Sequence, residues 1–336
     1  MRKVLFILAL SLPITAKAQN AATPVQTCLA DGPAEPRIAA CSTILADGKL
    51  SDKNRGAALA GRCLAQNSKR EFKLAITDCA AALEFDPAQS RAWFGRAVAY
   101  LRLGQTDRAK ADYDQTLKLD PKLLDAWVGR ADTALTRGRF NDAIADLNQA
   151  LKLNPTHAPA YSDRGLAYLR KGDLDRAVAD FSAAIGLDPT LAAALNNRGT
   201  LFARKGDLDR AVADYTTALK LLPTYAPALG NRGEALRRQG KLTEAIADFD
   251  AALKARPGYA AALSNRGETR FAQGDMVRAL EDLTAAVAAD PGHRLSYERR
   301  AKVLLALNRS DEATADVRKA KELQGRPKAT GPNVEL

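Results

Sequence analysis

The chain contains 336 residues, and its 50 lysines and arginines against 39 acidic residues give a formal net charge of +11 at pH 7. Hydrophobic residues make up 46% of it but aromatic residues only 6%, so most of its apolar side chains are small. Small apolar side chains let helices approach closely and favour packed helices over sheets. Charges of both signs alternate along most of the sequence, which is typical of a solvated surface.

The first eighteen residues have the pattern of an export signal. Arg2 and Lys3 precede an apolar run over 4–12, and residues 16–18 read Ala-Lys-Ala. We predict cleavage after Ala18, which removes three cations and lowers the net charge to +8. The apolar run is shorter than the roughly 20 residues of a membrane span, so an uncleaved anchor is the weaker alternative. We therefore expect an exported chain without an integral membrane segment, in the periplasm or secreted, and no nucleic-acid partner.

All four cysteines lie in the first quarter of the chain, and an even number in an exported protein indicates disulfides. Three pairings are possible. We favour Cys28 with Cys41 and Cys63 with Cys79, because each pair closes a short loop. A zinc site is disfavoured, since no Cys-x-x-Cys spacing occurs and both histidines are far away in sequence. We expect no metal and no cofactor.

Seven prolines recur at intervals of thirty-four residues without insertion or deletion. They are Pro87, Pro121, Pro155, Pro189, Pro223, Pro257 and Pro291. A fixed period of this size predicts stacked supersecondary units with one continuous core. With the proline at position 32 of each unit, eight repeats begin at Gly56, Ser90, Leu124, Ala158, Ala192, Ala226, Ala260 and Arg294.

Each repeat shows the apolar periodicity of two helices. In the fourth repeat Tyr161, Gly165 and Tyr168 share one helical face, and Ala177 and Phe181 share another. A glycine recurs between the two segments, where it can cap the first helix. It is present in six units as Gly104, Gly138, Gly172, Gly206, Gly240 and Gly274. The sequence therefore predicts one helical hairpin per repeat.

These features resemble the tetratricopeptide repeat family, whose units are thirty-four residues long. Alanine fills position 20 of all eight units, and position 8 is always Gly, Ala or Cys. The resemblance covers 56–324 and implies an all-α solenoid of eight helix-turn-helix repeats in a right-handed superhelix, whose concave groove is lined by the first helices. We expect 19–55 to be an N-terminal cap that contains Cys28 and Cys41, with a short helix over 37–45 after an irregular stretch, and 325–336 to be a disordered tail.

Position 7 departs from the family pattern, because it is arginine in every unit, and position 23 is aspartate in every unit. The two positions lie at similar heights in an antiparallel hairpin. We therefore predict structural ion pairs such as Arg164 with Asp180 and Arg198 with Asp214. A ladder of arginines offered to an anionic ligand is the weaker alternative, because each arginine has its own counter-charge.

No catalytic constellation occurs in the sequence. A histidine beside a nucleophile, a glycine-rich phosphate loop and metal-ligand spacing are all missing. His157 and His293 fall in equivalent turns between repeats, where we expect them to be exposed. We predict that the protein is not an enzyme, and an enzyme acting on envelope polymers is disfavoured.

Binding of a protein or peptide is better supported, because the positions that would line the groove change character along the chain. Phe94 and Leu101 are predicted apolar anchors in the second repeat. Asn197, Asn231 and Asn265 recur at position 6 of later repeats, and such amides can bond the backbone of an extended peptide. The alternative is that Asn-Arg-Gly is only the copied start of each repeat.

Basic residues end many first helices, namely Arg102, Arg137, Arg170, Lys171, Arg204, Lys205, Arg237 and Arg238. Compensation of the helix dipole is the favoured explanation, and an edge for an acidic partner is the alternative. Together these features predict a protein-interaction scaffold of the bacterial cell envelope. The competing hypothesis is a structural protein that self-associates through its last hairpin, after Arg294.

Overall fold

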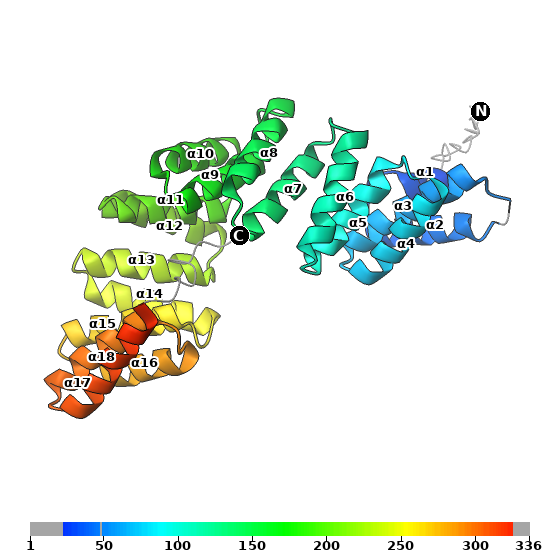
Figure 1. Ribbon diagram of the computed structural model, residues 1–336. Helices are drawn as coiled ribbons and strands as arrows, with labels where there is room; N and C mark the ends of the chain where they lie inside the picture. Colours follow the sequence, from blue (N-terminus) through cyan, green and yellow to red (C-terminus); the bar gives the residue numbers. More distant parts are fainter. Residues whose placement is uncertain (1–22, 48, 325–336) are drawn as a thin grey trace, which may run out of the picture. The chain divides into compact units, whose positions relative to one another are not determined.

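The computed structural model describes residues 23–47 and 49–324 (Figure 1). Within these ranges the chain forms eighteen α-helices and no strand. The all-α solenoid expected from the repeats is therefore confirmed. The predicted signal peptide, 1–18, and the predicted tail, 325–336, lie outside the described residues.

The chain divides into two compact units, with the boundary between Ala126 and Trp127. The N-terminal unit contains α1 (Pro24–Leu29), α2 (Ala34–Leu45), α3 (Asp52–Ser68), α4 (Phe72–Phe85), α5 (Ser90–Arg102) and α6 (Thr106–Leu119). The boundary falls within α7 (Leu124–Thr136), and the C-terminal unit continues with α8 (Phe140–Leu153), α9 (Ala158–Lys171), α10 (Leu174–Leu187), α11 (Ala192–Arg204), α12 (Leu208–Leu221), α13 (Ala226–Arg238), α14 (Leu242–Ala255), α15 (Ala260–Ala272), α16 (Met276–Ala289), α17 (Arg294–Ala306) and α18 (Ser310–Gln324).

Each predicted repeat is one antiparallel pair of helices, in which the odd-numbered helix comes first. Turns inside the hairpins use the left-handed backbone region, and Gly172 and Gly206 both have φ of 85°. In the first and last repeats Arg70 and Asn308 replace the glycine and still have φ of 63° and 60°. The hairpin geometry is thus kept even where the residue is not glycine.

In the fourth to sixth repeats the core of the hairpin depends on a glycine at position 8 facing an aromatic residue at position 24. A Cβ placed on Gly199 would lie 2.8 Å from the ring of Tyr215, and one on Gly233 would lie 2.7 Å from Phe249. The alanines at position 20 are at most 1% exposed in all eight repeats. The aromatic ring of the second helix therefore packs directly on the bare backbone of the first helix.

The N-terminal cap is more regular than predicted. The segment expected to be irregular contains α1, which begins with a capping box in which Thr23 and Gln26 exchange side-chain and backbone hydrogen bonds. Arg62 donates from Nη1 to Ser42 Oγ at 3.1 Å, as Arg198 donates to Ser182 Oγ at 3.2 Å. Ser42 thus has the same place in α2 as Ser182 has in α10. The cap is a shortened helical hairpin stacked ahead of the first repeat.

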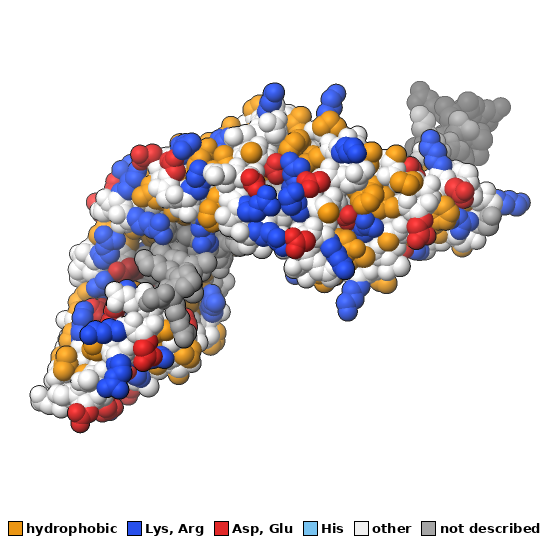
Figure 2. All heavy atoms as spheres, in the orientation of Figure 1, with side chains coloured by type: hydrophobic (Ala, Val, Ile, Leu, Met, Phe, Trp, Pro, Cys, Tyr) orange, Lys and Arg blue, Asp and Glu red, His pale blue; other side chains and the backbone are white. Residues whose placement is uncertain are grey.

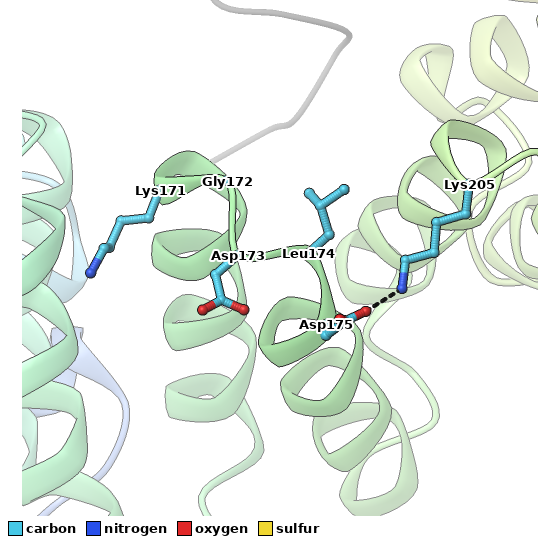
Figure 3. Close-up of a pocket in the computed structure, with 6 residues that line it drawn as sticks. All are labelled: Lys171, Gly172, Asp173, Leu174, Asp175 and Lys205. Carbon is cyan, nitrogen blue, oxygen red and sulfur yellow. Dashed lines mark hydrogen bonds and ion pairs between the residues drawn. The ribbon is translucent and has the colours of Figure 1, made fainter.

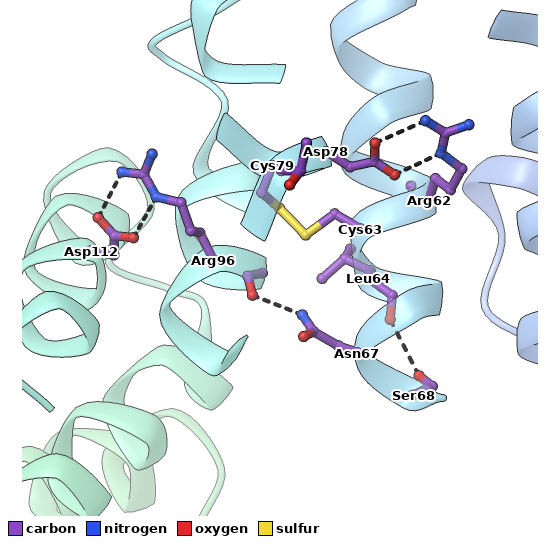
Figure 4. Close-up of a disulfide and its surroundings, with 12 residues drawn as sticks. Arg62, Cys63, Leu64, Asn67, Ser68, Asp78, Cys79, Arg96 and Asp112 are labelled. Carbon is purple, nitrogen blue, oxygen red and sulfur yellow. Dashed lines mark hydrogen bonds and ion pairs between the residues drawn. A yellow bond between two sulfur atoms is a disulfide. The ribbon is translucent and has the colours of Figure 1, made fainter. Parts of the chain in front are cut away.

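Two disulfides join the helices of the first two hairpins, Cys28 to Cys41 and Cys63 to Cys79. All four cysteines are completely buried. Figure 4 shows the second disulfide between α3 and α4, beside the pair of Arg62 and Asp78. Covalent links thus replace a large apolar contact inside these two hairpins.

Candidate functional site

The first helices of the C-terminal unit form the candidate binding surface. Successive first helices contact one another directly, α11 with α13, α13 with α15 and α15 with α17. Position 6 of each repeat therefore recurs along this surface, which we call the first-helix face. From the fourth to the eighth repeat this position holds Asp163, Asn197, Asn231, Asn265 and Arg299.

Asn231 connects two first helices through hydrogen bonds. Its Nδ2 donates to Asn196 Oδ1 at 2.9 Å and to Thr200 Oγ1 at 3.4 Å. Thr200 in turn receives a hydrogen bond from Tyr215 OH on α12 at 3.2 Å. The pKa of Tyr215 rises to about 12, mainly because the phenol is buried. The Asn231 amide therefore takes part in holding α11, α12 and α13 together.

Asn265 is engaged in a similar way by the next repeat. Arg299 donates from Nη1 to Asn265 Oδ1 at 2.6 Å and to Ser264 Oγ at 2.9 Å. Glu268 lies 3.6 Å from Nε of the same arginine. Burial lowers the pKa of Arg299, and the nearby carboxylate of Glu268 opposes that shift. This part of the face is a neutralised polar network between α15 and α17.

Asn197 differs from the other two asparagines. Its side chain is only 3% exposed, and its one hydrogen bond is accepted from Asn196 Nδ2 at a long 3.4 Å. Among the described residues, the Asn197 amide nitrogen donates no hydrogen bond.

Asp163 also departs from the pattern of its neighbours. It is half-buried on α9. Burial raises the pKa of Asp163 to about 7, and repulsion from the Asp132 carboxylate adds to the rise. Sequence reasoning missed this residue because it searched position 6 for amides. The signal was present, since a carboxylate stands at that position immediately before the asparagine series.

The predicted apolar anchors lie in the N-terminal unit, on α5. Phe94 and Leu101 are half-buried, and the Phe94 ring packs 6.1 Å from the ring of buried Tyr113. Position 6 in this unit is glycine. A Cβ on Gly95 would lie 2.8 Å from Cys79 Sγ, so there is no room for a larger side chain beside the disulfide.

The arginines at position 7 all bind the aspartates at position 23 through two hydrogen bonds. Arg164 reaches both carboxylate oxygens of Asp180 at 2.8 Å, and Arg198 reaches those of Asp214 at 2.8 Å. The eight aspartates are 4–7% exposed. The hydrogen bonds that Arg164 donates to Asp180 raise the pKa of Arg164, against the effect of burial. The remaining nitrogen of Arg164 reaches Asn148 of the preceding repeat at 2.7 Å, which ties neighbouring hairpins together.

Several of the basic residues that end the first helices bridge neighbouring repeats. Lys171 donates to Asn141, Lys205 pairs with Asp175, and Arg238 donates to the carbonyl of Ala203. Figure 3 shows the Lys205 to Asp175 contact at the rim of a shallow polar pocket between two hairpins. Figure 2 shows acidic and basic side chains interspersed over the visible surface. Lys171, Lys205 and Arg238 therefore connect neighbouring repeats.

The two histidines are half-buried rather than exposed, so that expectation was wrong. His157 Nδ1 accepts a hydrogen bond from the Ala160 N–H at 3.1 Å, and His293 Nδ1 lies 2.6 Å from Ser296 Oγ. Each residue caps a first helix. No group of three or more possible metal-ligating side chains occurs in the part of the chain that the structure describes. No helix within the described ranges is long and apolar enough to cross a membrane.

Comparison with solved structures places this fold among known repeat proteins. One match is the Cut9–Hcn1 hetero-tetramer of the APC/C, with a TM-score of 0.64 and 19% identity over 81% of this chain and 53% of that one. The chain thus spans about half the length of that relative. A tetratricopeptide repeat protein from Parabacteroides merdae has a TM-score of 0.58 and 21% identity, covering 75% of this chain and 99% of its own. The pilF protein of Pseudomonas aeruginosa has a TM-score of 0.58 and 19% identity, covering 65% and 98%.

At these identities the similarity shows the fold alone. No curated protein sequence matches the chain significantly. The model of the tetratricopeptide repeat family matches seven overlapping segments between 68 and 329, well over half of the sequence. Together with the hairpin architecture, this match shows that the chain belongs to the tetratricopeptide repeat family.

Proposed function

We propose that the protein is a non-catalytic scaffold of the bacterial cell envelope that binds an extended segment of a partner protein on the first-helix face of its C-terminal unit. Tetratricopeptide repeats generally serve as protein-interaction scaffolds. The observation that carries the proposal is the series of amide side chains at position 6 of the first helices, Asn197, Asn231 and Asn265. A peptide backbone offers both donors and acceptors to such amides.

The three predicted asparagines have different roles in this proposal. Asn231 and Asn265 support neighbouring helices through hydrogen bonds to the protein. Replacing either one therefore weakens the scaffold as well as any contact with a ligand. Among the described residues, Asn197 forms a side-chain hydrogen bond only with its chain neighbour Asn196. Its replacement should therefore disturb the scaffold least and test binding most directly. Phe94 and Leu101 stay proposed anchors of a separate surface in the N-terminal unit.

The location rests on the predicted signal over 1–18 and on the two disulfides. Intramolecular disulfides form and persist in oxidising compartments such as the periplasm. A test is to fuse residues 1–18 to a reporter that is active only after export. Export of the reporter supports the proposal, and retention in the cytoplasm contradicts it.

Photo-crosslinking in the native envelope tests the binding surface. A photoreactive residue replaces exposed Ala193 on α11, and the matched control replaces exposed Thr217 on α12 of the same repeat. We expect adducts from position 193, few from position 217, and loss of the adducts when Asn197→Ala is added. Adducts that form equally from both positions, or that persist with Asn197→Ala, contradict the proposal. A thermal unfolding curve of Asn197→Ala confirms that the chain still folds.

Self-association through the last hairpin is the second candidate, and one residue favours it. Val317 at position 24 is 41% exposed, whereas position 24 of every other repeat is at most 1% exposed. The neighbouring positions 21 and 28 are polar, Thr314 and Lys321, which reduces the apolar area. Light scattering of the full chain and of Val317→Lys separates the two. A dimer that Val317→Lys dissociates supports self-association, and a monomer throughout removes it.

A further inference from the structure

Two arginines end consecutive first helices of the C-terminal unit, and within the described ranges neither forms an ion pair. Arg204 is the last residue of α11 and Arg238 the last residue of α13, and both are exposed. Arg238 donates from Nη1 to the carbonyl of Ala203 at 2.8 Å, which places its guanidinium beside the last turn of α11, where Arg204 lies. The neighbouring Lys205 and Arg237, by contrast, each bind a carboxylate. Two positive charges thus lie close together without a carboxylate partner.

These two arginines also lie next to the polar network of the first-helix face. Tyr215 OH donates to Thr200 Oγ1, which also accepts a hydrogen bond from Asn231 Nδ2. Burial raises the pKa of Tyr215, and the positive charges of Arg238 and Arg204 oppose that rise. Charges shift a pKa in this way only from nearby. Both guanidinium groups therefore flank the network that joins α11, α12 and α13.

The sequence places an amide and an arginine on the same face of both first helices. Asn197 and Arg204 are seven residues apart on α11, as are Asn231 and Arg238 on α13. Seven residues make nearly two turns, so each pair shares one helical face at a separation of about 10.5 Å along the axis. Only the fifth and sixth repeats combine asparagine at position 6 with arginine at position 13. The combination marks one stretch of the first-helix face.

Both groups suit an extended peptide that contains acidic residues. The amides can bond the peptide backbone, and side chains project from that backbone toward the helix ends. A guanidinium binds a carboxylate through two parallel hydrogen bonds, as Arg198 binds Asp214 inside the fifth hairpin. Compensation of the helix dipole also favours a cation at a helix end, but it needs no amide two turns earlier.

We propose that Arg204 and Arg238 bind acidic side chains of the extended peptide whose backbone contacts the amides of Asn197 and Asn231. This inference rests on the proposed function and adds the chemical class of its ligand, a peptide with aspartate or glutamate residues. The net charge of +11 attracts such a peptide at long range, and the two arginines fix its register on the first-helix face.

The test is selection of peptides from a displayed library of random dodecapeptides by the full-length mature protein. The variant combines Arg204→Gln and Arg238→Gln. The matched control combines Arg102→Gln and Lys118→Gln, which removes two exposed positive charges from the N-terminal unit and gives the same net charge. We expect the natural protein and the control to enrich peptides with aspartate or glutamate at a fixed position. The variant should lose that preference.

A selected peptide is then synthesised with its acidic residues and with the corresponding amides, and affinities are measured by fluorescence anisotropy. At low salt the natural protein and the control should bind the acidic peptide about tenfold more tightly than the amide peptide, and the variant should bind both alike. Arg204→Gln alone, which keeps the hydrogen bond from Arg238 to Ala203, should lower the ratio to about threefold. High salt should reduce the ratio, because both arginines are exposed. Urea unfolding checks that every variant retains the fold.

The outcomes separate this inference from the proposed function. Peptides that bind on the first-helix face without acidic residues overturn the inference and leave the proposed function standing. An acidic preference that the variant retains also overturns it. An equal loss in the control would mean that net charge alone attracts the peptides, which contradicts a site at the two arginines. If the natural protein enriches no peptide at all, the proposed function fails, and the inference fails with it.

Discussion

The two units of the molecule share one hairpin design but differ at position 6 of the first helix. In the N-terminal unit this position is Gly61 or Gly95, and each glycine packs against the disulfide of the preceding hairpin. In the C-terminal unit Gly129 of the third repeat still holds the position, and from the fourth repeat on it carries polar residues, beginning with Asp163 and Asn197. The same place in the repeat therefore closes the stack in the N-terminal unit and presents polar groups from the fourth repeat onward.

The pairs of position 7 with position 23 are alike in both units. Arg96 binds Asp112 in the N-terminal unit at 2.7 and 2.9 Å, and Arg164 binds Asp180 in the C-terminal unit at 2.8 Å. What recurs in both units is the hairpin scaffold, and what differs between them is the candidate site. Equivalent mutations in the two units therefore test whether the scaffold is shared and whether the candidate site is confined to the C-terminal unit.

The largest effect should come from breaking a buried ion pair. Asp180→Ala leaves the Arg164 guanidinium, which is 19% exposed, without its carboxylate, and should lower the free energy of unfolding by about 3–5 kcal/mol. Asp112→Ala should cost a similar amount in the other unit. Urea unfolding measures both. The control is Asp175→Ala, whose carboxylate is 91% exposed and should contribute less than about 1 kcal/mol. A small loss for Asp180→Ala would show that the pair is not structural.

Removing a disulfide should destabilise the N-terminal unit and leave the stability of the C-terminal unit unchanged. The double variant Cys63→Ala and Cys79→Ala opens a link across 16 residues and should destabilise the N-terminal unit by about 2–5 kcal/mol. Hydrogen exchange should increase in α3 to α5 and stay unchanged in α11 to α15, because the cross-link lies wholly in the N-terminal unit. An equal increase in α11 to α15 would mean that the units do not unfold independently.

Replacing Asp163 should have a smaller effect on the free energy of unfolding, and the effect should be stabilising. The pKa of Asp163 is about 7 in the folded chain against about 3.9 for an unfolded aspartate, so folding retains a proton between these values. Stability therefore falls as the pH rises from about 4 to 7 and is level above that. Asp163→Asn should stabilise the chain by about 1–3 kcal/mol at pH 8 and by less at pH 5. Urea unfolding at both pH values measures it, and destabilisation at pH 8 would contradict the assignment.

The smallest effect is expected at the rim of the pocket in Figure 3. Lys205→Ala removes an exposed pair with Asp175 and should change the free energy of unfolding by less than about 0.5 kcal/mol. The difference should become smaller still at high salt, because salt screens exposed charges. A loss comparable to that of Asp180→Ala would mean that exposed bridges between repeats stabilise the C-terminal unit as much as the buried pairs do.

The sequence predicted the scaffold because its periodicity constrains every hairpin in the same way. The proline interval located the helices, and the uniform Arg and Asp positions indicated the ion pairs. The sequence did not predict α1, because this helix has only six residues and shows little apolar periodicity. Its start is nevertheless marked by a capping box formed by Thr23 and Gln26. Local cues of this kind are easily overlooked outside a repeat.

The candidate site was harder to predict because hydrogen bonds between repeats decide the role of each amide. Asn197 and Asn231 have the same local sequence, Asn-Arg-Gly, yet Asn231 donates across to Asn196 of the preceding repeat, whereas Asn197 only accepts a hydrogen bond from its chain neighbour Asn196. The difference depends on residues thirty-five positions away. Asp163 was overlooked because the rise of its pKa comes mainly from burial, which only packing in three dimensions reveals.

Hydrogen exchange of the full-length mature protein, with and without a peptide selected on it, tests the central claim most directly. We predict slower exchange in α9 and α11 when the peptide is bound, because these helices carry polar residues at position 6. Exchange in α3 and α5 should stay unchanged, because their position 6 is a glycine packed against a disulfide. Slower exchange in α3 and α5, or only in the second helices α10 and α12, would contradict it.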